Sequence, residues 1–349
     1  MKITGNQRGV ALLVTLLVIS LLTVIVIEFT HSTEVDGHLT RNSLASAQAG
    51  YLARSGLALA EMTLRIDAEA KAKRPPERLP VETLTDPWAQ PFPPMPVGAG
   101  FGAAGFTIID ESSRFNVNAL SLSGQTQGTK AIMRQELFQG ILEAVGLDEN
   151  LLYALVDWLD PGDDSDRESG AESPYYLGLR PPYVPRNGRL LSIEELTLVK
   201  GFEQLTWEQW TALRMMLTAM PNEDLRINVH TAPELLLTAL FAKRDAESVA
   251  RTIIESRVER PFADQRELNQ LLDSYGLDYL KEIFTLRSDV FTIYATGSAG
   301  DLERHVAVTE ELRRQQFPPR LTILNWREEA LPVALTSAEA SVGMTSPLP

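Results

Sequence analysis

The sequence predicts an α+β fold with one long N-terminal helix, a small antiparallel sheet and a large inserted all-α domain. An unbroken apolar run extends from Val10 to Ile27, and helical spacing of apolar residues continues beyond it. Alternating strand patterns occupy about 102–118 and 288–326, and helical patterns fill the chain between them. Because the two strand regions flank the helical block, the simplest topology inserts a helical domain into an α+β domain.

The N-terminus is a short basic leader that ends at Gly9, and the apolar run begins at the next residue, Val10. As a helix the run covers about 27 Å, close to the thickness of a bilayer core. An ordinary secretory signal has its cleavage site after the apolar core, but no such small-residue site follows Ile27. A cut after Gly9 would therefore leave the membrane helix on the mature protein. The alternative is a simple anchor with Lys2 and Arg8 on the cytoplasmic side.

The same helix is expected to continue to about Ala70, with Gly37 and Gly50 as places where it could bend. Apolar residues keep helical spacing there, at Leu52, Leu59, Met62 and Ile66. Half of this helix would lie in the membrane and half would pack on the body. The prolines from Pro75 to Pro96 then predict an irregular, partly extended loop.

Strands are predicted within Gly102–Leu120, Val290–Thr296, His305–Leu312 and Leu321–Trp326, with a turn at Asp110–Ser113 inside the first of these ranges. Helices are predicted from Thr129 to about Leu286. Four helix starts there have the spacing of a capping residue and its partner: Ser192 with Glu195, Thr206 with Gln209, Thr231 with Glu234, and Asp264 with Glu267. The tail from Ala334 to Pro349 is predicted to be disordered.

Composition excludes several classes of function. The net charge of −14 argues against a nucleic-acid partner, which needs a basic face. The chain has no cysteine, so it has neither disulfides nor thiol chemistry. Its four histidines lack zinc-site spacing, and no Gly-x-Ser-x-Gly nucleophile elbow occurs.

The order of basic leader, Gly9 and apolar helix resembles the class III signal of type IV pilins and of the pseudopilins of type II secretion. This resemblance implies that a prepilin peptidase cuts after Gly9 and methylates Val10. Most members have Glu as the fifth mature residue, whereas this chain has Val14. A subunit at the filament tip has no neighbour above it for that Glu to engage, and an unpartnered Glu in hydrocarbon is costly. Ordinary membrane-helix composition explains Val14 equally well.

The rest of the chain is similar to the large minor pseudopilin of type II secretion, the K component, through a series of motifs in that family's order. They are Asp110-Glu111 with Phe115-Asn116-Val117-Asn118, Leu155-Val156-Asp157-Trp158-Leu159-Asp160, Gly170-Ala171-Glu172, Tyr175-Tyr176, Pro182-Tyr183, Ser192-Ile193-Glu194-Glu195-Leu196 with Gly201-Phe202, and Ile227-Asn228-Val229-His230-Thr231-Ala232. The last departs from the family at His230, where Asn is usual.

The resemblance implies a pseudopilin-type sheet and a domain division into leader (1–9), membrane part of the helix (10–28), periplasmic part of the helix (29–72), α+β domain (73–120 and 287–328), inserted helical domain (121–286) and tail (329–349). It implies a non-enzymatic subunit that caps the tip of the periplasmic pseudopilus and helps initiate its assembly for export of folded proteins across the outer membrane. The expected partners are the I and J minor pseudopilins, the prepilin peptidase, and the secretin or an exported substrate. The expected location is the bacterial inner membrane, with the N-terminus in the cytoplasm and the body in the periplasm.

The densest acidic run of the chain lies between Asp157 and Glu172. Flexible loops rich in carboxylates suit calcium, which takes six to eight oxygen ligands, but the EF-hand spacing is missing. A solvated acidic loop explains the composition equally well. The K family is known for calcium in this loop, so the resemblance favours a structural calcium site. The ligands expected from it are Asp160, Asp163, Asp164, Asp166 and Glu172.

Two other functions remain open at this point. One is a minor type IV pilin in filament initiation or adhesion, which the helical insertion and the missing Glu disfavour. The other is a membrane-anchored periplasmic metal-dependent hydrolase that uses the acidic loop, for which turnover would depend on Asp160 or Asp163.

Overall fold

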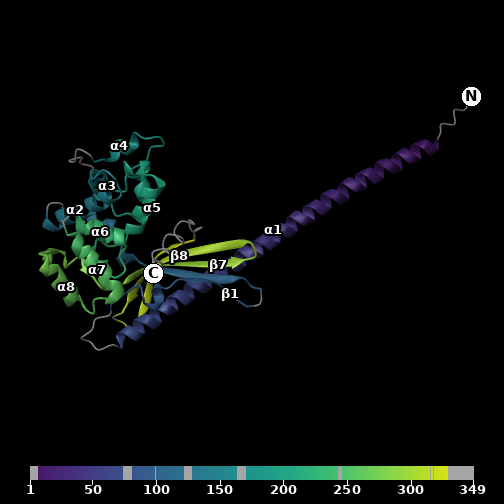
Figure 1. Cartoon of the computed structure of the whole chain (residues 1–349). Coiled ribbons are helices and arrows are strands. Elements are labelled where there is room, and N and C mark those ends of the chain that lie inside the picture. The colour runs from purple at the N-terminus through teal and green to yellow at the C-terminus, as the bar shows by residue number, and fades with distance from the viewer. Residues whose placement is uncertain are drawn as a thin grey trace, which may run out of the picture.

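The computed structural model describes residues 7–73, 81–98, 100–121, 128–162, 170–242, 246–314, 316 and 318–328. Helix α1 (Gln7–Ala72) is one unbroken rod, and its N-terminal half projects far from the body (Figure 1). The expectation of a single long helix is confirmed. It begins at Gln7, and it passes Gly37 and Gly50 without interruption.

Five antiparallel strands form the main sheet in the order β1-β2-β7-β8-β9. They are β1 (Phe92–Pro96), β2 (Ala103–Asp110), β7 (Val290–Ala299), β8 (Leu302–Arg313) and β9 (Arg320–Arg327). The loop prediction is wrong at β1, because this proline-rich segment pairs with β2. It does so as an edge strand, where a proline without an N–H group is tolerated.

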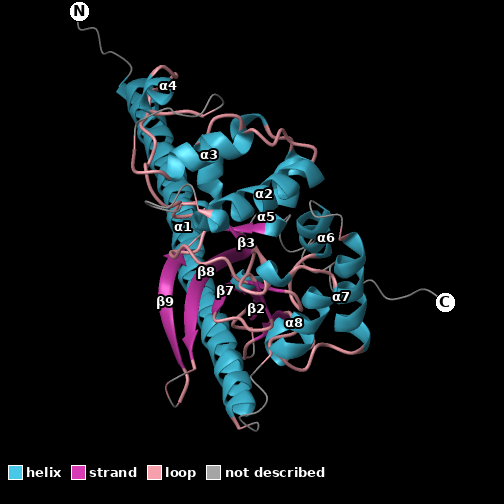
Figure 2. Ribbon diagram, turned by 90° about the vertical axis from the view of Figure 1, so that its left-hand side faces the viewer, coloured by secondary structure: helices cyan, strands magenta, loops and turns pink. Residues whose placement is uncertain are grey.

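Helix α1 lies across one face of this sheet (Figure 2). Ala53 and Leu64 of the helix share a buried cluster with Phe291 and Ile293 of β7. Two glycines permit the close approach: a Cβ atom on Gly56 would lie 2.7 Å from the carbonyl oxygen of Gly105, and one on Gly297 would lie 2.2 Å from that of Ala49. The helix therefore rests directly on the backbone of the sheet.

A helical domain is inserted between β2 and β7. It contains α2 (Thr129–Ala144), α3 (Leu151–Leu159), α4 (Ser173–Leu177), α5 (Trp207–Met216), α6 (Glu234–Ala242), α7 (Glu247–Glu259) and α8 (Gln265–Ser274). Two short parallel pairs join its segments: β3 (Phe115–Asn116) with β4 (Leu217–Thr218), and β5 (Ile227–Asn228) with β6 (Phe284–Thr285). The α+β class with a large inserted helical domain is thus confirmed, although the two short strand pairs make the insertion not purely helical.

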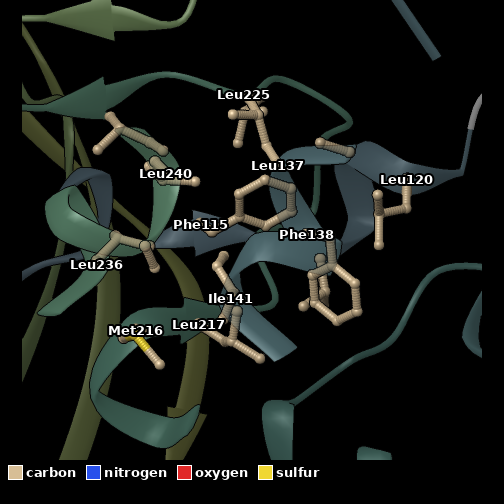
Figure 3. Close-up of a cluster of buried hydrophobic side chains, with 14 of the residues drawn as sticks. Phe115, Leu120, Leu137, Phe138, Ile141, Met216, Leu217, Leu225, Leu236 and Leu240 are labelled. Atoms are coloured by element: carbon tan, nitrogen blue, oxygen red, sulfur yellow. The ribbon is translucent and has the colours of Figure 1, made fainter. Parts of the chain in front are cut away.

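The helical domain has its own apolar core, separate from the cluster beneath α1. Phe115 and Phe138 pack in it with ring centroids 5.7 Å apart, and Leu137, Ile141 and Leu240 surround them (Figure 3). Phe115 comes from the segment directly after β2. That segment therefore links the sheet to the core of the insertion.

The segment after β2 contains the turn that its sequence predicts at Asp110–Ser113, but only two residues of the chain beyond it form the predicted strand. The chain forms a 3₁₀ helix at Glu111–Ser113, the two residues of β3 and a second 3₁₀ helix at Val117–Leu120. The cause is local, because the carboxylate of Asp110 accepts from the amide of Ser112 and the side chain of Asn116 accepts from the amide of Asn118. These bonds offer the backbone an alternative to strand pairing.

Of the four predicted helix starts, two form the expected capping hydrogen bonds and two do not. Thr206 forms a complete capping box with Gln209, and Asp264 accepts from two amides of the first turn of α8. Ser192 makes no capping bond, and a 3₁₀ helix follows it. The hydroxyl of Thr231 donates to Asp110 instead. A tertiary partner thus replaces the local cap at Thr231.

Candidate functional site

The N-terminal half of α1 is the most exposed apolar surface of the molecule. The large apolar side chains from Val10 to Ile27 are all exposed, and the described residues contain one helix that is long and apolar enough to cross a membrane. The hydroxyls of Thr15, Ser20 and Thr23 each donate to a backbone carbonyl of the preceding turn, at 2.8 Å. Polar groups in this segment are therefore satisfied within the helix, as a lipid environment requires.

The expected processing residues, Gly9 and Val10, lie in the first turn of α1. Residues 1–6 of the expected leader lie outside the described residues. The structure thus leaves the expected cut after Gly9 as a prediction.

The C-terminal half of α1 has two different faces. Its buried face rests on the sheet through residues such as Ala53, Ala60 and Leu64. At about 100° of rotation per residue, the opposite face carries exposed Leu44, Tyr51, Leu59, Met62 and Ile66. We call these five residues the outer stripe. Apolar residues aligned on the outside of a helix form a surface suited to another helix.

The acidic loop follows α3, and only its two flanks lie within the described residues. Asp160 is the C-cap of α3, and Glu172 is the N-cap of α4, with 5% of its surface exposed. Asp163, Asp164 and Asp166 lie outside the described residues. Buried Asp157, which is not among the expected ligands, accepts from the amide of Ala171 at 2.9 Å and so holds the returning chain against α3.

The flanks of this loop are also held from outside it. The side-chain nitrogen of Asn187 donates to the carbonyl of Gly162 at 3.0 Å, and the ammonium of Lys200 donates to that of Gly170 at 3.0 Å. The Oδ1 atom of Asn187 is buried and has no hydrogen-bond partner among the described residues. Asn187 is not among the residues that the sequence predicts for this site, although an Asn-Gly pair is itself a turn signal.

The described flanks of the loop carry oxygen donors of the kind that a hard cation binds. Carboxylates of Asp160 and Glu172 flank the loop, and Asn187 adds a buried amide oxygen that accepts no hydrogen bond from the described residues. Calcium binds such oxygens, and buried polar atoms are ordinarily paired. The donor set at the described flanks is therefore compatible with the calcium that the sequence resemblance implies.

A different carboxylate group comes close enough to hold a metal among the described residues. It consists of Asp67, Glu82 and Asp86. The ammonium of Lys71 already lies among them, at 2.7 Å from Asp67 and 2.6 Å from each of Glu82 and Asp86. This group is an internal ion cluster in which lysine supplies the cation.

The polar residues of the Asp-Glu…Asn-x-Asn motif are buried parts of the framework. Asn118 donates to the carbonyls of Leu190 (2.9 Å) and Met220 (2.7 Å) and accepts from the amide of Leu190 (2.8 Å). Asn116 accepts from the amide of Met220 at 3.0 Å. These side chains act as backbone partners for segments that lie far along the chain.

Asp110 joins the sheet to the helical domain. One of its carboxylate oxygens accepts from the hydroxyls of Thr231 and Ser288, each at 2.5 Å. Burial raises the pKa of Asp110 to about 6, against the effect of these hydroxyls. The carboxyl group is used in structural hydrogen bonds.

His230, the departure from the family pattern, is also structural. Its Nε2 accepts from the amide of Phe262 at 3.1 Å, and the two rings stack with centroids 5.8 Å apart. Burial lowers the pKa of His230 to about 4, so the imidazole is neutral at pH 7.

Comparisons with known proteins agree with this arrangement. The family model described as "Type II secretion system (T2SS), protein K" matches residues 113–222. Type II secretion system protein K of Pseudomonas aeruginosa is 27% identical, over 96% of this chain and 97% of its own. That of Klebsiella pneumoniae is 30% identical, over 72% of this chain and 76% of its own. A solved structure of the GspK-GspI-GspJ complex from the type II secretion system of enterotoxigenic Escherichia coli contains a similar fold. Its TM-score is 0.67 at 18% identity, covering 84% of this chain and 99% of that one.

Proposed function

The chain belongs to the type II secretion system protein K family and is a minor pseudopilin, and we propose that it caps the tip of the periplasmic pseudopilus. The observation that carries this proposal is the division of α1. Its exposed apolar half suits a membrane anchor, and its other half packs on one face of the sheet of the body. Such a helix can anchor the subunit in the membrane before assembly. After assembly the same helix can pack against the helices of neighbouring subunits.

The location at the tip is supported by where the bulk of the molecule lies. The helical domain sits at the end of the molecule opposite the projecting half of α1 (Figure 1). With the anchor in the inner membrane and the basic leader in the cytoplasm, this domain points away from the membrane into the periplasm. Val14 at the fifth mature position fits a subunit with no neighbour above it, because a buried carboxylate there would lack a partner.

We further propose that the I and J minor pseudopilins bind along α1, and that this assembly initiates the pseudopilus used to export folded proteins across the outer membrane. The related solved complex contains GspK with GspI and GspJ. The outer stripe supplies an exposed apolar surface that continues the direction of the membrane segment.

Processing is tested by mass spectrometry of the mature N-terminus, from cells with and without a prepilin peptidase. A methylated Val10 that requires the peptidase is expected. An intact Met1, or a cut after the apolar run, would contradict the pseudopilin assignment of the N-terminus.

Assembly is tested by co-purification of the full chain in detergent with the I and J components. Tyr51→Asp and Met62→Asp are expected to reduce recovery of the complex strongly, because each places a charge on the outer stripe. Val258→Asp is the matched control, since Val258 is 81% exposed and lies on α7 of the helical domain. Equal losses in all three variants would argue against packing along α1.

We propose that the acidic loop binds structural calcium through Asp160, Asp163, Asp164, Asp166 and Glu172, with Asn187 as an added oxygen donor. A bound calcium ion would neutralise the carboxylates and fix the loop between α3 and α4. The described residues hold the ends of the loop in place for it, through Asp157, Asn187 and Lys200.

Calcium binding is tested by measuring bound metal and the unfolding midpoint of the full chain before and after chelation. Chelation is expected to lower the midpoint, and Asp160→Asn is expected to abolish that difference. Asp278→Asn, at an exposed acid of the same domain, serves as the control. If chelation leaves the unfolding midpoint of the unmodified chain unchanged, the calcium proposal is wrong.

The role we propose is structural, without turnover. It is supported by the use of Asp110, Asn116 and Asn118 as buried hydrogen-bond partners. Under this proposal Asp160→Asn lowers stability and secretion together. Hydrolysis of a substrate that is lost in the same variant would point to a metal-dependent enzyme instead.

A further inference from the structure

A groove of about 430 Å³ lies between the sheet and the helical domain. Four arginines and two glutamates are among its lining residues: Arg114, Arg189, Arg214, Arg327, Glu111 and Glu194. The groove therefore carries excess positive charge in a chain whose net charge is −14. Local charge opposite in sign to that of the whole protein favours an acidic ligand.

The charges converge on one carboxylate. Arg214 of α5 lies 3.0 Å from one oxygen of Glu194, and Arg327 of β9 lies 3.4 Å from the other. The side chain of Glu194 is 44% exposed, whereas those of Arg214 and Arg327 are 16% and 26% exposed. Each guanidinium has five N–H donors in a planar fork. Arg214 and Arg327 can therefore bind a second carboxylate beside Glu194, or bind a ligand carboxylate in place of Glu194. Glu194 thus occupies a carboxylate site that faces solvent.

The groove opens on the sheet face that α1 does not cover. Along β7, Phe291 and Ile293 face α1, so the alternation of side chains places Thr292 and Tyr294 on the opposite face. Thr292 and Tyr294 line the groove. Subunits that pack along the outer stripe of α1 would therefore leave the groove accessible to a protein outside the filament.

We propose that this groove binds an extended acidic segment of an exported protein, with one of its carboxylates replacing Glu194 between Arg214 and Arg327. The chemistry of the ligand follows from the charges of the groove. The choice of an exported protein as its source rests on the proposed role in secretion.

Binding is tested by fluorescence anisotropy with the full chain in detergent micelles. The probe is a labelled peptide of alternating glutamate and glycine, and its control is the same peptide with glutamine. Arg327→Ala is expected to weaken glutamate-peptide binding about tenfold, because a charge-assisted pair is lost. Glu194→Gln is expected to strengthen it several-fold, because the competing carboxylate is removed at nearly constant size. Arg320→Ala, on the same edge strand but outside the groove, should leave binding unchanged.

Three results would overturn the binding site: equal affinity for the glutamine peptide, an equal loss in Arg320→Ala, or no gain in Glu194→Gln. The last would mean that Glu194 only links α5 to β9, in which case Glu194→Gln lowers the unfolding midpoint alone.

The source of the ligand is tested in secreting cells. Arg327→Ala should leave the mature N-terminus and co-purification with the I and J components intact, while exported protein accumulates in the periplasm. Normal secretion in a variant that has lost peptide binding would overturn the choice of source. Loss of the complex with I and J would instead assign the groove to assembly. Neither result would affect the membership of the chain in the protein K family.

Discussion

The ammonium nitrogen of Lys71 lies 2.6 Å from a carboxylate oxygen of Glu82, and both side chains are buried. Lys71 belongs to the last turn of α1, whereas Glu82 precedes β1. The other oxygen of Glu82 binds Arg314, which follows β8. This pair therefore connects the end of the anchor helix to the segment before β1 and, through Arg314, to the segment between β8 and β9.

Lys71→Met should destabilise the body by about 3–5 kcal/mol, because it leaves buried carboxylates without their cation. The free energy of unfolding of the full chain in detergent measures this effect. Lys73→Met, two residues later at an exposed position, should change it little. A similar loss in both variants would mean that the ion cluster contributes nothing beyond surface charge.

Asn118→Ala should cost about 2–4 kcal/mol, because the amide and carbonyl of Leu190 and the carbonyl of Met220 lose their side-chain partner inside the protein. Denaturant unfolding measures the loss. Asn150→Ala is the comparison, since the hydrogen bonds of Asn150 are exposed. If the two alanine variants unfold alike, the framework role of the motif is refuted.

The stability losses in Thr206→Ala and Ser192→Ala can be compared, because Thr206 forms a helix cap in the structure whereas the cap at Ser192 is predicted by the sequence but does not form. Thr206 accepts from the amide of Gln209 in a complete capping box, so its loss should cost about 1 kcal/mol. Ser192 makes no capping bond, so its replacement should cost close to nothing. Thermal unfolding of the two variants under identical conditions checks the difference, and a reversed order would contradict the structure.

Glu310 on β8 is 2% exposed, and we expect its ionisation to make the stability of the fold depend on pH. Burial and the charge of Glu61 raise its pKa to about 7, while Arg65 opposes the shift. When the pKa of a carboxyl group is higher in the folded state than in the unfolded state, its contribution to stability is fully present at pH values below the pKa of the unfolded state. That contribution is lost as the pH rises through about 7.

Glu310→Gln should therefore stabilise the protein by about 2 kcal/mol at pH 8 and by much less near pH 4. Chemical unfolding at the two pH values measures this. Glu311→Gln changes the next residue, whose side chain is more exposed and pairs with Arg313, and it should not reproduce the pH-dependent gain. A gain that is equal at both pH values would exclude ionisation of Glu310 as its cause.

Much of the fold could be predicted because its signals are local. The apolar run from Val10 to Ile27 and the alternation of β7 report on neighbouring residues in the chain. The turn at Asp110–Ser113 was predictable from its residues, whereas the second turn was not, because the side chain of Asn116 binds the amide of Asn118 and a 3₁₀ helix replaces strand pairing there. The prolines of β1 concealed an edge strand, since proline is excluded from sheet centres but not from sheet edges.

The candidate sites were predictable only in part. The acidic loop was visible in the sequence, and Asp160 and Glu172 do flank it. Asn187 was not predicted, because its contact with Gly162 comes from a turn far along the chain. The convergence of Arg214 and Arg327 on Glu194 brings together three separate elements and leaves no local pattern.

By itself the sequence determined the membrane helix, the α+β class with a helical insertion and the family resemblance, because each depends on the order and spacing of residues. Only the tertiary structure decided that Lys71 supplies the cation of a buried carboxylate cluster, that Asn118 replaces missing backbone partners, and that the groove is basic. The physical reason is that burial, ion pairing and hydrogen bonding act between groups that are close in space, whatever their distance along the chain.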